Sequence, residues 1–102
     1  MAKIYISEYA AMAKAWAHPD QIAAPQEPCD SDQAPLAIGG VSAQSAAFGL
    51  GVRLVRVHTD AICSIAFGAD PTATTNNKRM AAGATEYFGV TPGHRLACIT
   101  NT

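Results

Sequence analysis

The sequence predicts an all-β fold, a small antiparallel β-sandwich of jelly-roll-like form with about seven or eight short strands. Two observations lead to this prediction. Segments rich in β-branched and aromatic residues recur along the chain, separated by glycine and proline turn signals about every 8–12 residues. Within these segments apolar residues alternate, as two-faced strands require. The 102 residues fit a single domain spanning residues 1–102.

The first predicted strand covers residues 3–7, where Ile4 and Ile6 favour extended backbone. Residues 8–17 have helical propensity. A helix there would end before Pro19, because the residue preceding a proline is pushed out of the helical region. Helix and irregular structure are both compatible with this segment. The strands expected further along the chain are residues 35–38, 41–48, 52–59, 61–68, 79–81, 85–90 and 95–100.

Two pairs of these strands are expected to form hairpins. The strands on either side of Asp60 form the first, with Asp60 as the turn residue. The second turns at residues 91–93, because Pro92 has the φ angle of a first turn position and Gly93 accepts a positive φ. A further turn is expected at residues 82–83.

Alternation also predicts the core. The strand at residues 52–59 carries apolar residues on both faces, so it is either central in a sandwich or covered by a partner. Replacement of Phe67 by Ala is expected to cost about 3–5 kcal/mol of folding free energy. The predicted core residues are Leu54, Val55, Val57, Ile65, Phe67, Phe88, Leu96 and Ile99.

Residues 20–35 are the first candidate contact region. Their prolines remove donors from a β-ladder and favour extended backbone, so the segment is predicted to be an extended arm or a long loop. An arm lying on a neighbouring subunit and an ordinary surface loop are both compatible with this pattern. The residues proposed to contact a partner are Pro25, Pro28, Asp30 and Asp32.

Residues 69–77 are the second candidate contact region. An aspartate followed by proline favours a turn, and the threonines and asparagines after it supply neutral hydrogen-bonding groups. The segment is interpreted either as a tip that contacts a partner or ligand, or as a solvated connection. The proposed contact residues here are Asp70, Thr72, Thr74 and Asn76.

The charge of the chain excludes several classes of partner. It has 7 basic and 8 acidic residues and a net charge of −1, so no basic field exists to hold nucleic acid. No segment approaches the roughly 20 apolar residues of a membrane span, so no membrane partner is expected. Charged residues make up 15 % of the chain, a low share that favours a component of an assembly.

The residues that carry chemistry do not form a recognisable catalytic set. His58 and Cys63 could approach across the first hairpin, but no further ligands complete a zinc site and an apolar setting does not activate a thiol. Cys29, Cys63 and Cys98 are odd in number and widely spaced, so we expect reduced, structural thiols. We therefore expect neither an enzyme nor a bound cofactor or metal.

Residues 53–100 contain a run of turn and core motifs, VRV, FGADPTAT, AGATEYFGV and GHRLACI. Together with the opening KIYISEY, this pattern resembles small structural proteins of tailed-bacteriophage virions. The matching positions are residues 55–57, Asp60, Phe67, Gly68, residues 70–74, Ala82, Gly83, residues 86–88, Val90, Gly93 and residues 96–99.

The resemblance implies a capsid decoration (cement) protein, often trimeric, that stabilises the phage head by bridging capsomers. Its partners would be the major capsid protein and copies of itself, on the head surface of a virion whose proteins are made in the host cytoplasm. A tail, vertex or spike component is an alternative. A small carbohydrate-binding module is a third class; such modules normally present exposed aromatic residues, and the single tryptophan, Trp16, lies outside the predicted sheets.

Overall fold

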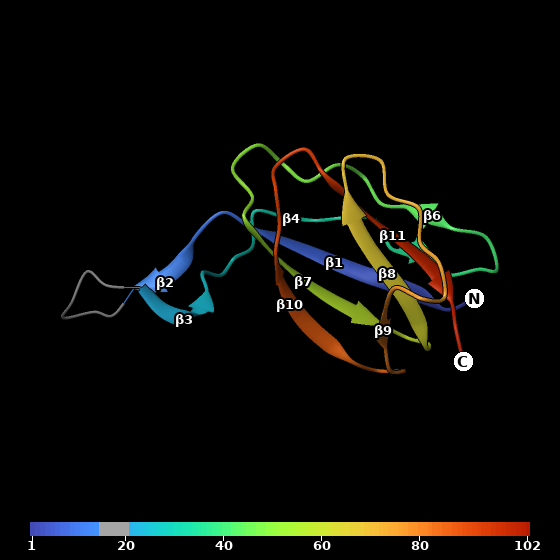
Figure 1. Ribbon diagram of the computed structural model, residues 1–102. Coiled ribbons are helices and arrows are strands. Elements are labelled where there is room, and N and C mark those ends of the chain that lie inside the picture. Colours follow the sequence, from blue (N-terminus) through green and yellow to red (C-terminus); the bar gives the residue numbers. More distant parts are fainter. Residues whose placement is uncertain (15–20) are drawn as a thin grey trace.

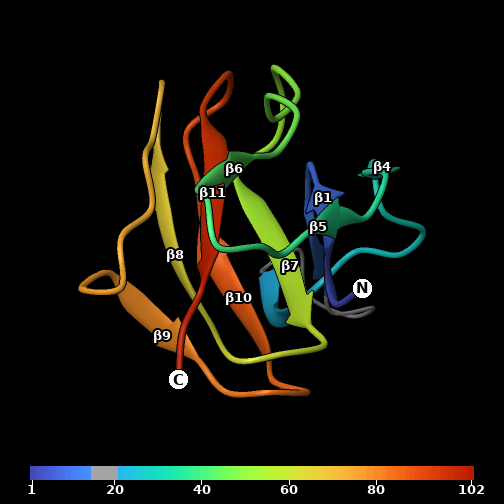
Figure 2. The ribbon, with the colours of Figure 1, turned by 90° about the vertical axis from the view of Figure 1, so that its right-hand side faces the viewer.

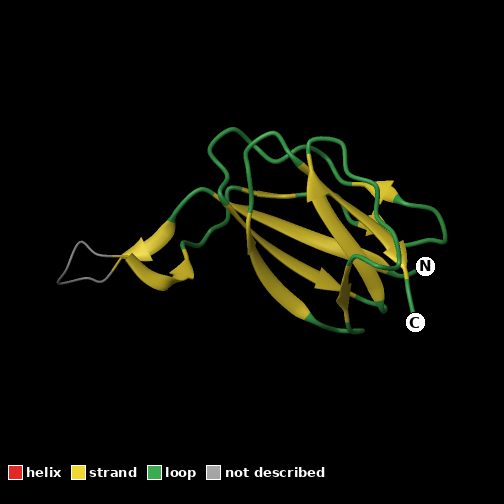
Figure 3. Ribbon diagram, viewed as in Figure 1, coloured by secondary structure: helices red, strands yellow, loops and turns green. Residues whose placement is uncertain are grey.

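The computed structural model describes residues 1–14 and 21–102, and these residues form strands and no helix (Figure 3). The prediction of an all-β, antiparallel fold is confirmed. The described part of the chain accordingly has no helix long and apolar enough to cross a membrane. The expected helix end at Pro19, and with it Trp16, His18 and Asp20, lies outside the described residues.

The first sheet is built around the N-terminal strand, which pairs antiparallel with β7 over six residues. β10 continues the sheet beyond β7, and two short strands, β4 and β5, pair with the other edge of the N-terminal strand. The strands of this sheet are β10 (Thr85–Gly89), β7 (Leu54–Thr59), β1 (Lys3–Tyr9), β4 (Ser31–Asp32) and β5 (Leu36–Ala37).

The second sheet contains β6 (Ala43–Gln44), β11 (Arg95–Thr100), β8 (Cys63–Gly68) and β9 (Lys78–Met80), in that order. It lies opposite the first sheet, and the buried cluster between them draws on strands of both (Figure 2). This arrangement is consistent with a small β-sandwich. The remaining strands, β2 (Met12–Lys14) and β3 (Gln21–Pro25), pair only with each other. Their hairpin extends beyond one end of the sheets (Figure 1).

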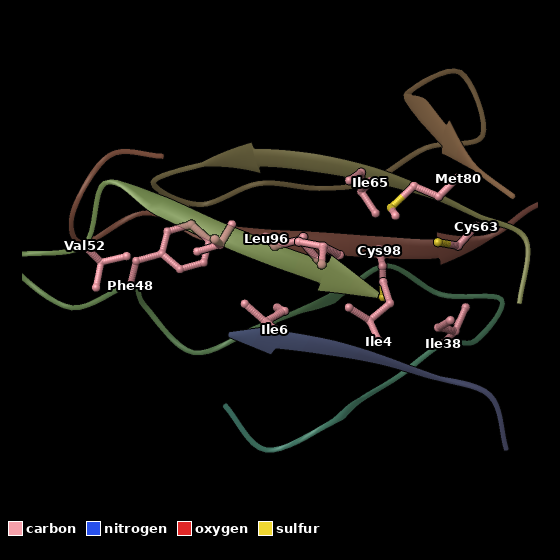
Figure 4. Close-up of a cluster of buried hydrophobic side chains, with 12 residues drawn as sticks. Ile4, Ile6, Ile38, Phe48, Val52, Cys63, Ile65, Met80, Leu96 and Cys98 are labelled. Carbon is pink, nitrogen blue, oxygen red and sulfur yellow. The ribbon is translucent and has the colours of Figure 1, made fainter. Parts of the chain in front are cut away.

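The core lies between the two sheets (Figure 4). Ile4 and Ile6 of β1 point inward with alternate residues of β7, and they meet Ile65 and Leu96 from the second sheet. Phe48 closes one end of the cluster. Four predicted core residues, Val55, Val57, Ile65 and Leu96, are fully buried, with at most 1 % of their surface exposed.

Four other predicted core residues are only partly buried. Leu54 alternates with the inward Val55 and therefore lies on the outer face of the first sheet. Ile99 lies on the outer face of β11 for the same reason. Phe67 and Phe88 pack against the edge of the core, with their ring centroids 5.1 Å apart. The prediction that these four residues are mostly buried is therefore met, although Leu54 and Ile99 lie outside the core between the sheets.

The two predicted hairpins are not present. β7 pairs with β1 and β10, whereas β8 pairs with β11 and β9, so the chain passes from one sheet to the other at Asp60. The Asp60 backbone N–H donates to the Lys3 carbonyl at 3.1 Å, and the Lys3 N–H donates to Asp60 Oδ2 at 3.2 Å. These two bonds hold the corner against the start of β1.

The same crossing occurs between β10 and β11, which lie in different sheets. The turn itself is where it was predicted: the His94 N–H donates to the Thr91 carbonyl at 3.1 Å, and Gly93 has a φ of +83°. The turn between β9 and β10 also crosses between the sheets, with Gly83 at a φ of +75°. Turn positions were therefore predicted correctly, whereas the strands that they join pair elsewhere.

The N-terminal half departs most from expectation. Glu8 and Tyr9 belong to β1, and β2 follows where a helix or irregular structure was expected. Alternating burial in β1 overrides the local helical propensity. Within the segment 20–35, the described residues 21–35 include the extended strands β3 and β4, so this segment is not a plain loop. The strands expected at residues 35–38 and 41–48 shrink to two residues each. The described residues, 1–14 and 21–102, form eleven strands, where seven or eight were expected.

Candidate binding face

The outer faces of the two sheets differ, and the difference begins with the loop at residues 69–77. This loop crosses the outside of the second sheet and is fixed to the strand at its far edge. Gln44 of β6 donates from Nε2 to Asp70 Oδ1 at 2.7 Å and to the Pro71 carbonyl at 2.8 Å. The Ala73 N–H donates to Ser42 Oγ at 2.8 Å. The outer face of the second sheet is thus covered by the chain itself.

Small side chains beneath the loop allow this close approach. Ser64 and Ala97 are fully buried although both lie on the outer side of their strands. Asn101, which follows β11, fixes the loop to the sheet. Its Nδ2 donates to Ser64 Oγ at 2.7 Å and to the Thr75 carbonyl at 3.2 Å. Ala73 is 2 % exposed and fills the space above the sheet.

The structure separates the candidate contact residues of this loop. The carboxylate of Asp70 is bound by Gln44 and so faces the protein. Thr72, Thr74 and Asn76 are exposed, although the Thr74 N–H donates to the side chain of Asn77 at 2.7 Å. A partner contact by these three residues stays a prediction, and the loop has an internal role that the sequence interpretation missed.

Among the described residues, the outer face of the first sheet is open beyond Tyr9, which is buried. Its partly or fully exposed side chains come from alternate positions of neighbouring strands, and the register places Tyr5 beside His58 and Ser7 beside Arg56. Arg56 lies in turn beside Tyr87 of β10. Tyr5 is 41 % exposed and Tyr87 51 % exposed, which are high values for aromatic side chains. We call the surface formed by Tyr5, Ser7, Arg56, His58 and Tyr87 the open face.

Several contacts fix the side chains of the open face. The rings of Tyr5 and His58 lie 6.2 Å apart and are tilted by 49°. His58 Nδ1 lies 2.8 Å from Thr85 Oγ1, within hydrogen-bonding distance. Ser7 Oγ donates to Asp32 Oδ1. This bond, with a hydrogen bond from Cys29 and the charge of Arg56, lowers the pKa of Asp32, so its carboxylate stays ionised.

A groove of about 500 Å³ runs along this surface. Tyr5 and His58 line one end with the carboxylate of Asp60, and Ser7, Arg56 and Asp32 line the other. The groove therefore combines one exposed aromatic ring with donors and acceptors of both charges. Its size lies within the range of about 300–1,000 Å³ that is typical of small-ligand sites.

A second hollow, of about 340 Å³, adjoins the open face at the base of the β2–β3 hairpin. It lies between Leu54 and Tyr87 on the sheet and Met12, Ala24 and Pro25 on the hairpin. Tyr87 belongs to both regions, because it also neighbours Arg56 on the sheet. The two hollows thus flank one exposed tyrosine.

The remaining candidate contact residues fall into two groups. Asp32 reaches the groove and Pro25 lines the hollow beside it, so the structure brings these two to the open face. Pro28 and Asp30 are exposed on the connection between β3 and β4, away from the groove residues. Tyr5, Arg56, His58 and Tyr87 were not proposed as site residues. They alternate with more buried residues along β1, β7 and β10, but only the strand order shows that the outer faces of these strands are contiguous.

The histidine and cysteines do not form a reactive group. His58 lies on the open face, whereas Cys63 is buried in the core and its Sγ lies 3.5 Å from Thr59 Oγ1. The suggested approach of His58 to Cys63 was wrong, because the chain changes sheet between them. Burial raises the pKa of the Cys63 thiol, and raises that of Cys98 to about 11. Both thiols are therefore protonated at neutral pH.

Cys29 is half-buried near Asp32, and loss of hydration raises the pKa of its thiol. The three cysteines are free thiols in the structure. Within the described residues, no three histidine, cysteine or acidic side chains are grouped closely enough to hold a metal ion.

The chain was compared with known proteins in three ways. No protein-family model, no curated protein sequence and no solved structure matches it.

Proposed function

We propose that this chain is a non-enzymatic structural protein of a tailed-phage virion, and that it decorates the head by bridging capsomers. The observation that carries the proposal is the β2–β3 hairpin. It is closed at its base by the Gln26 N–H, which donates to the Ala11 carbonyl at 3.0 Å, and it pairs with neither main sheet. The molecule measures 48 × 25 × 22 Å, and the hairpin extends along the longest direction.

A projecting two-stranded ribbon gains little stability in water alone, so its extension favours a role as an arm on another chain. The low charge of the sequence and its resemblance to virion proteins support the same reading. The partners would be the major capsid protein and two further copies of this chain in a homotrimer. The jelly-roll-like form belongs to this proposal as well.

Deletion of the β2–β3 hairpin tests the proposal. A deletion of residues 20–35 would also remove β4 and the Gln33 N–H bond to the Ile6 carbonyl at 2.9 Å, so it would damage the first sheet. Deletion of residues 12–25, with Ala11 joined to Gln26 through Gly-Gly, spares both. We expect the full chain to sediment as a trimer and to bind purified phage heads, and the deletion variant to lose head binding while it keeps its fold.

Copy number in purified virions decides between locations. Quantitative mass spectrometry is expected to find hundreds of copies per particle, as a head decoration protein requires. A handful of copies would favour the tail, vertex or spike alternative. Absence from virions, or undiminished head binding by the deletion variant, would contradict the proposal.

A further inference from the structure

We propose that the open face binds a neutral glycan chain, laid across β1, β7 and β10. The first reason is access. The loop at residues 69–77 covers the outside of the second sheet, whereas among the described residues nothing comparable covers Tyr5, Arg56 and Tyr87. Exposed aromatic side chains on a strand face are a cost to a monomer unless a ligand or partner uses them.

The second reason is the pair of tyrosines. Tyr5 on β1 pairs with His58 of β7, and Tyr87 on β10 pairs with Arg56, two positions further along β7. Two strand spacings of ~4.8 Å and two residues of ~3.3 Å therefore place the two tyrosines diagonally, about 12 Å apart. The negative face of an aromatic ring attracts the weakly positive C–H groups on one side of a sugar ring. Two platforms at this separation suit an oligosaccharide better than a single sugar.

The third reason is the set of polar side chains that lines the groove beside Tyr5. Asp32 is an ionised acceptor that accepts a hydrogen bond from Ser7. Arg56 lies in the same row of paired residues, two strands away from Asp32, and its guanidinium offers several donors in one plane. A sugar hydroxyl both donates and accepts, so neighbouring hydroxyls can bridge a carboxylate and a guanidinium. The groove places these groups beside Tyr5 within one hollow of about 500 Å³.

Charge decides the class of glycan. The groove is lined by the carboxylates of Asp32 and Asp60 and by the guanidinium of Arg56. At neutral pH the groove therefore has no excess of positive charge, and a polyanionic sugar would meet two carboxylates. A neutral glycan gains the hydrogen bonds and the stacking without that repulsion.

The proposal is independent of the virion role, and it is tested with the full chain and defined sugars. The probes are cellohexaose, maltohexaose, chitohexaose and mannohexaose as neutral chains, with oligogalacturonate as the anionic comparison. Each is titrated into ¹⁵N-labelled protein. We expect saturable shifts for at least one neutral chain, centred on the amides of Tyr5, Arg56 and Tyr87, and little change in affinity with salt.

Variants locate the site. Tyr5→Ala and Tyr87→Ala are each expected to weaken binding about tenfold, because each removes one stacking platform. Tyr87→Phe keeps the ring and is expected to bind nearly as well as the parent. Thr72→Ala, on the loop over the other sheet, is the matched control and should change nothing. Both tyrosines are exposed, so an unchanged amide spectrum away from the open face will show that each variant is folded.

Three outcomes would overturn the proposal. They are no shift with any neutral chain at millimolar concentration, shifts that lie away from the open face, or binding of the anionic chain alone. If Tyr5→Ala and Tyr87→Ala abolish head binding while no sugar binds, the open face is a protein contact and the glycan assignment is wrong. Glycan binding by a chain absent from virions would leave this proposal standing and remove the virion role.

Discussion

Glu8 is a buried acidic residue whose two oxygens are both used. It is 4 % exposed, and Gln33 Nε2 donates to Oε2 while the Gly49 N–H donates to Oε1, each at 2.8 Å. Glu8 therefore joins the end of β1 to two loops. Glu8→Ala leaves these donors unsatisfied, and we expect a loss of about 1–3 kcal/mol in urea unfolding. Glu8→Gln, which keeps one acceptor, should lose less. Equal stability of all three proteins would contradict this role.

Tyr9 links the same strand to the connection after β3. It is 3 % exposed, and its hydroxyl donates to Glu27 Oε2 at 2.7 Å. Burial, with the hydrogen bond and negative charge of Glu27, raises the pKa of Tyr9 from 10.0 to about 12. The folded state thus favours the neutral phenol. Its stabilising contribution is complete below pH ~10 and is lost as the pH rises towards ~12.

Tyr9→Phe tests that pH dependence, because phenylalanine has no proton to lose. Denaturant unfolding of both proteins between pH 8 and 12 supplies the measurement. We expect the stability advantage of the parent over Tyr9→Phe to shrink between pH ~10 and ~12. Other tyrosines and lysines titrate in both proteins and cancel in the difference. A constant difference across this range would show that Tyr9 ionises at its ordinary pKa.

Phe67 is partly buried against the core, and its ring lies near two other aromatic rings. Its centroid lies 6.3 Å from that of Phe48 and 5.1 Å from that of Phe88. Because part of the ring is already in water, we expect Phe67→Ala to cost about 3 kcal/mol, the lower end of the usual range for buried phenylalanine. Phe67→Leu should recover most of that loss. An unchanged melting temperature for Phe67→Ala would rule out a core role.

At the scale of elements, the β2–β3 hairpin should be separable from the two main sheets. The described side chains Met12, Ala13, Ala24 and Pro25 are only partly buried, and none belongs to the core cluster. Deletion of residues 12–25 across the closed base should therefore change the melting temperature by no more than a few degrees. Calorimetry of the variant measures this. Loss of the unfolding transition would mean that the arm supports the sheets.

The elements also show how far the sequence could predict the fold. Alternation in residues 54–59 and 63–68 identified both strands, and Gly83 and Gly93 marked turns that exist. Strand pairing was wrong, because the register of β1 with β7 depends on residues about fifty positions apart. Short strands such as β4 cannot be recognised from the local sequence, because two residues are too few to show the alternation of apolar and polar side chains.

For the whole molecule, the same limit applies to the site. Each side chain of the open face is an ordinary polar or aromatic residue on a strand, and only the order β10-β7-β1-β4 places Tyr87, Arg56, Ser7 and Asp32 in one row. The polar loop at residues 69–77 gave the stronger local signal, yet most of its anchored groups face inward. The site is thus a property of the strand order.

The crossings at Asp60, Gly83 and Gly93 also bear on how this molecule can vary. The chain visits the two sheets in turn, so neither sheet corresponds to a contiguous stretch of sequence. Replacement of a contiguous segment of the core by a segment of another protein would therefore change strands in both sheets. The β2–β3 hairpin is different, because both of its strands are close in sequence and its base is closed. We therefore expect insertion, shortening and recombination to be tolerated at this hairpin, where a change of length leaves the core intact.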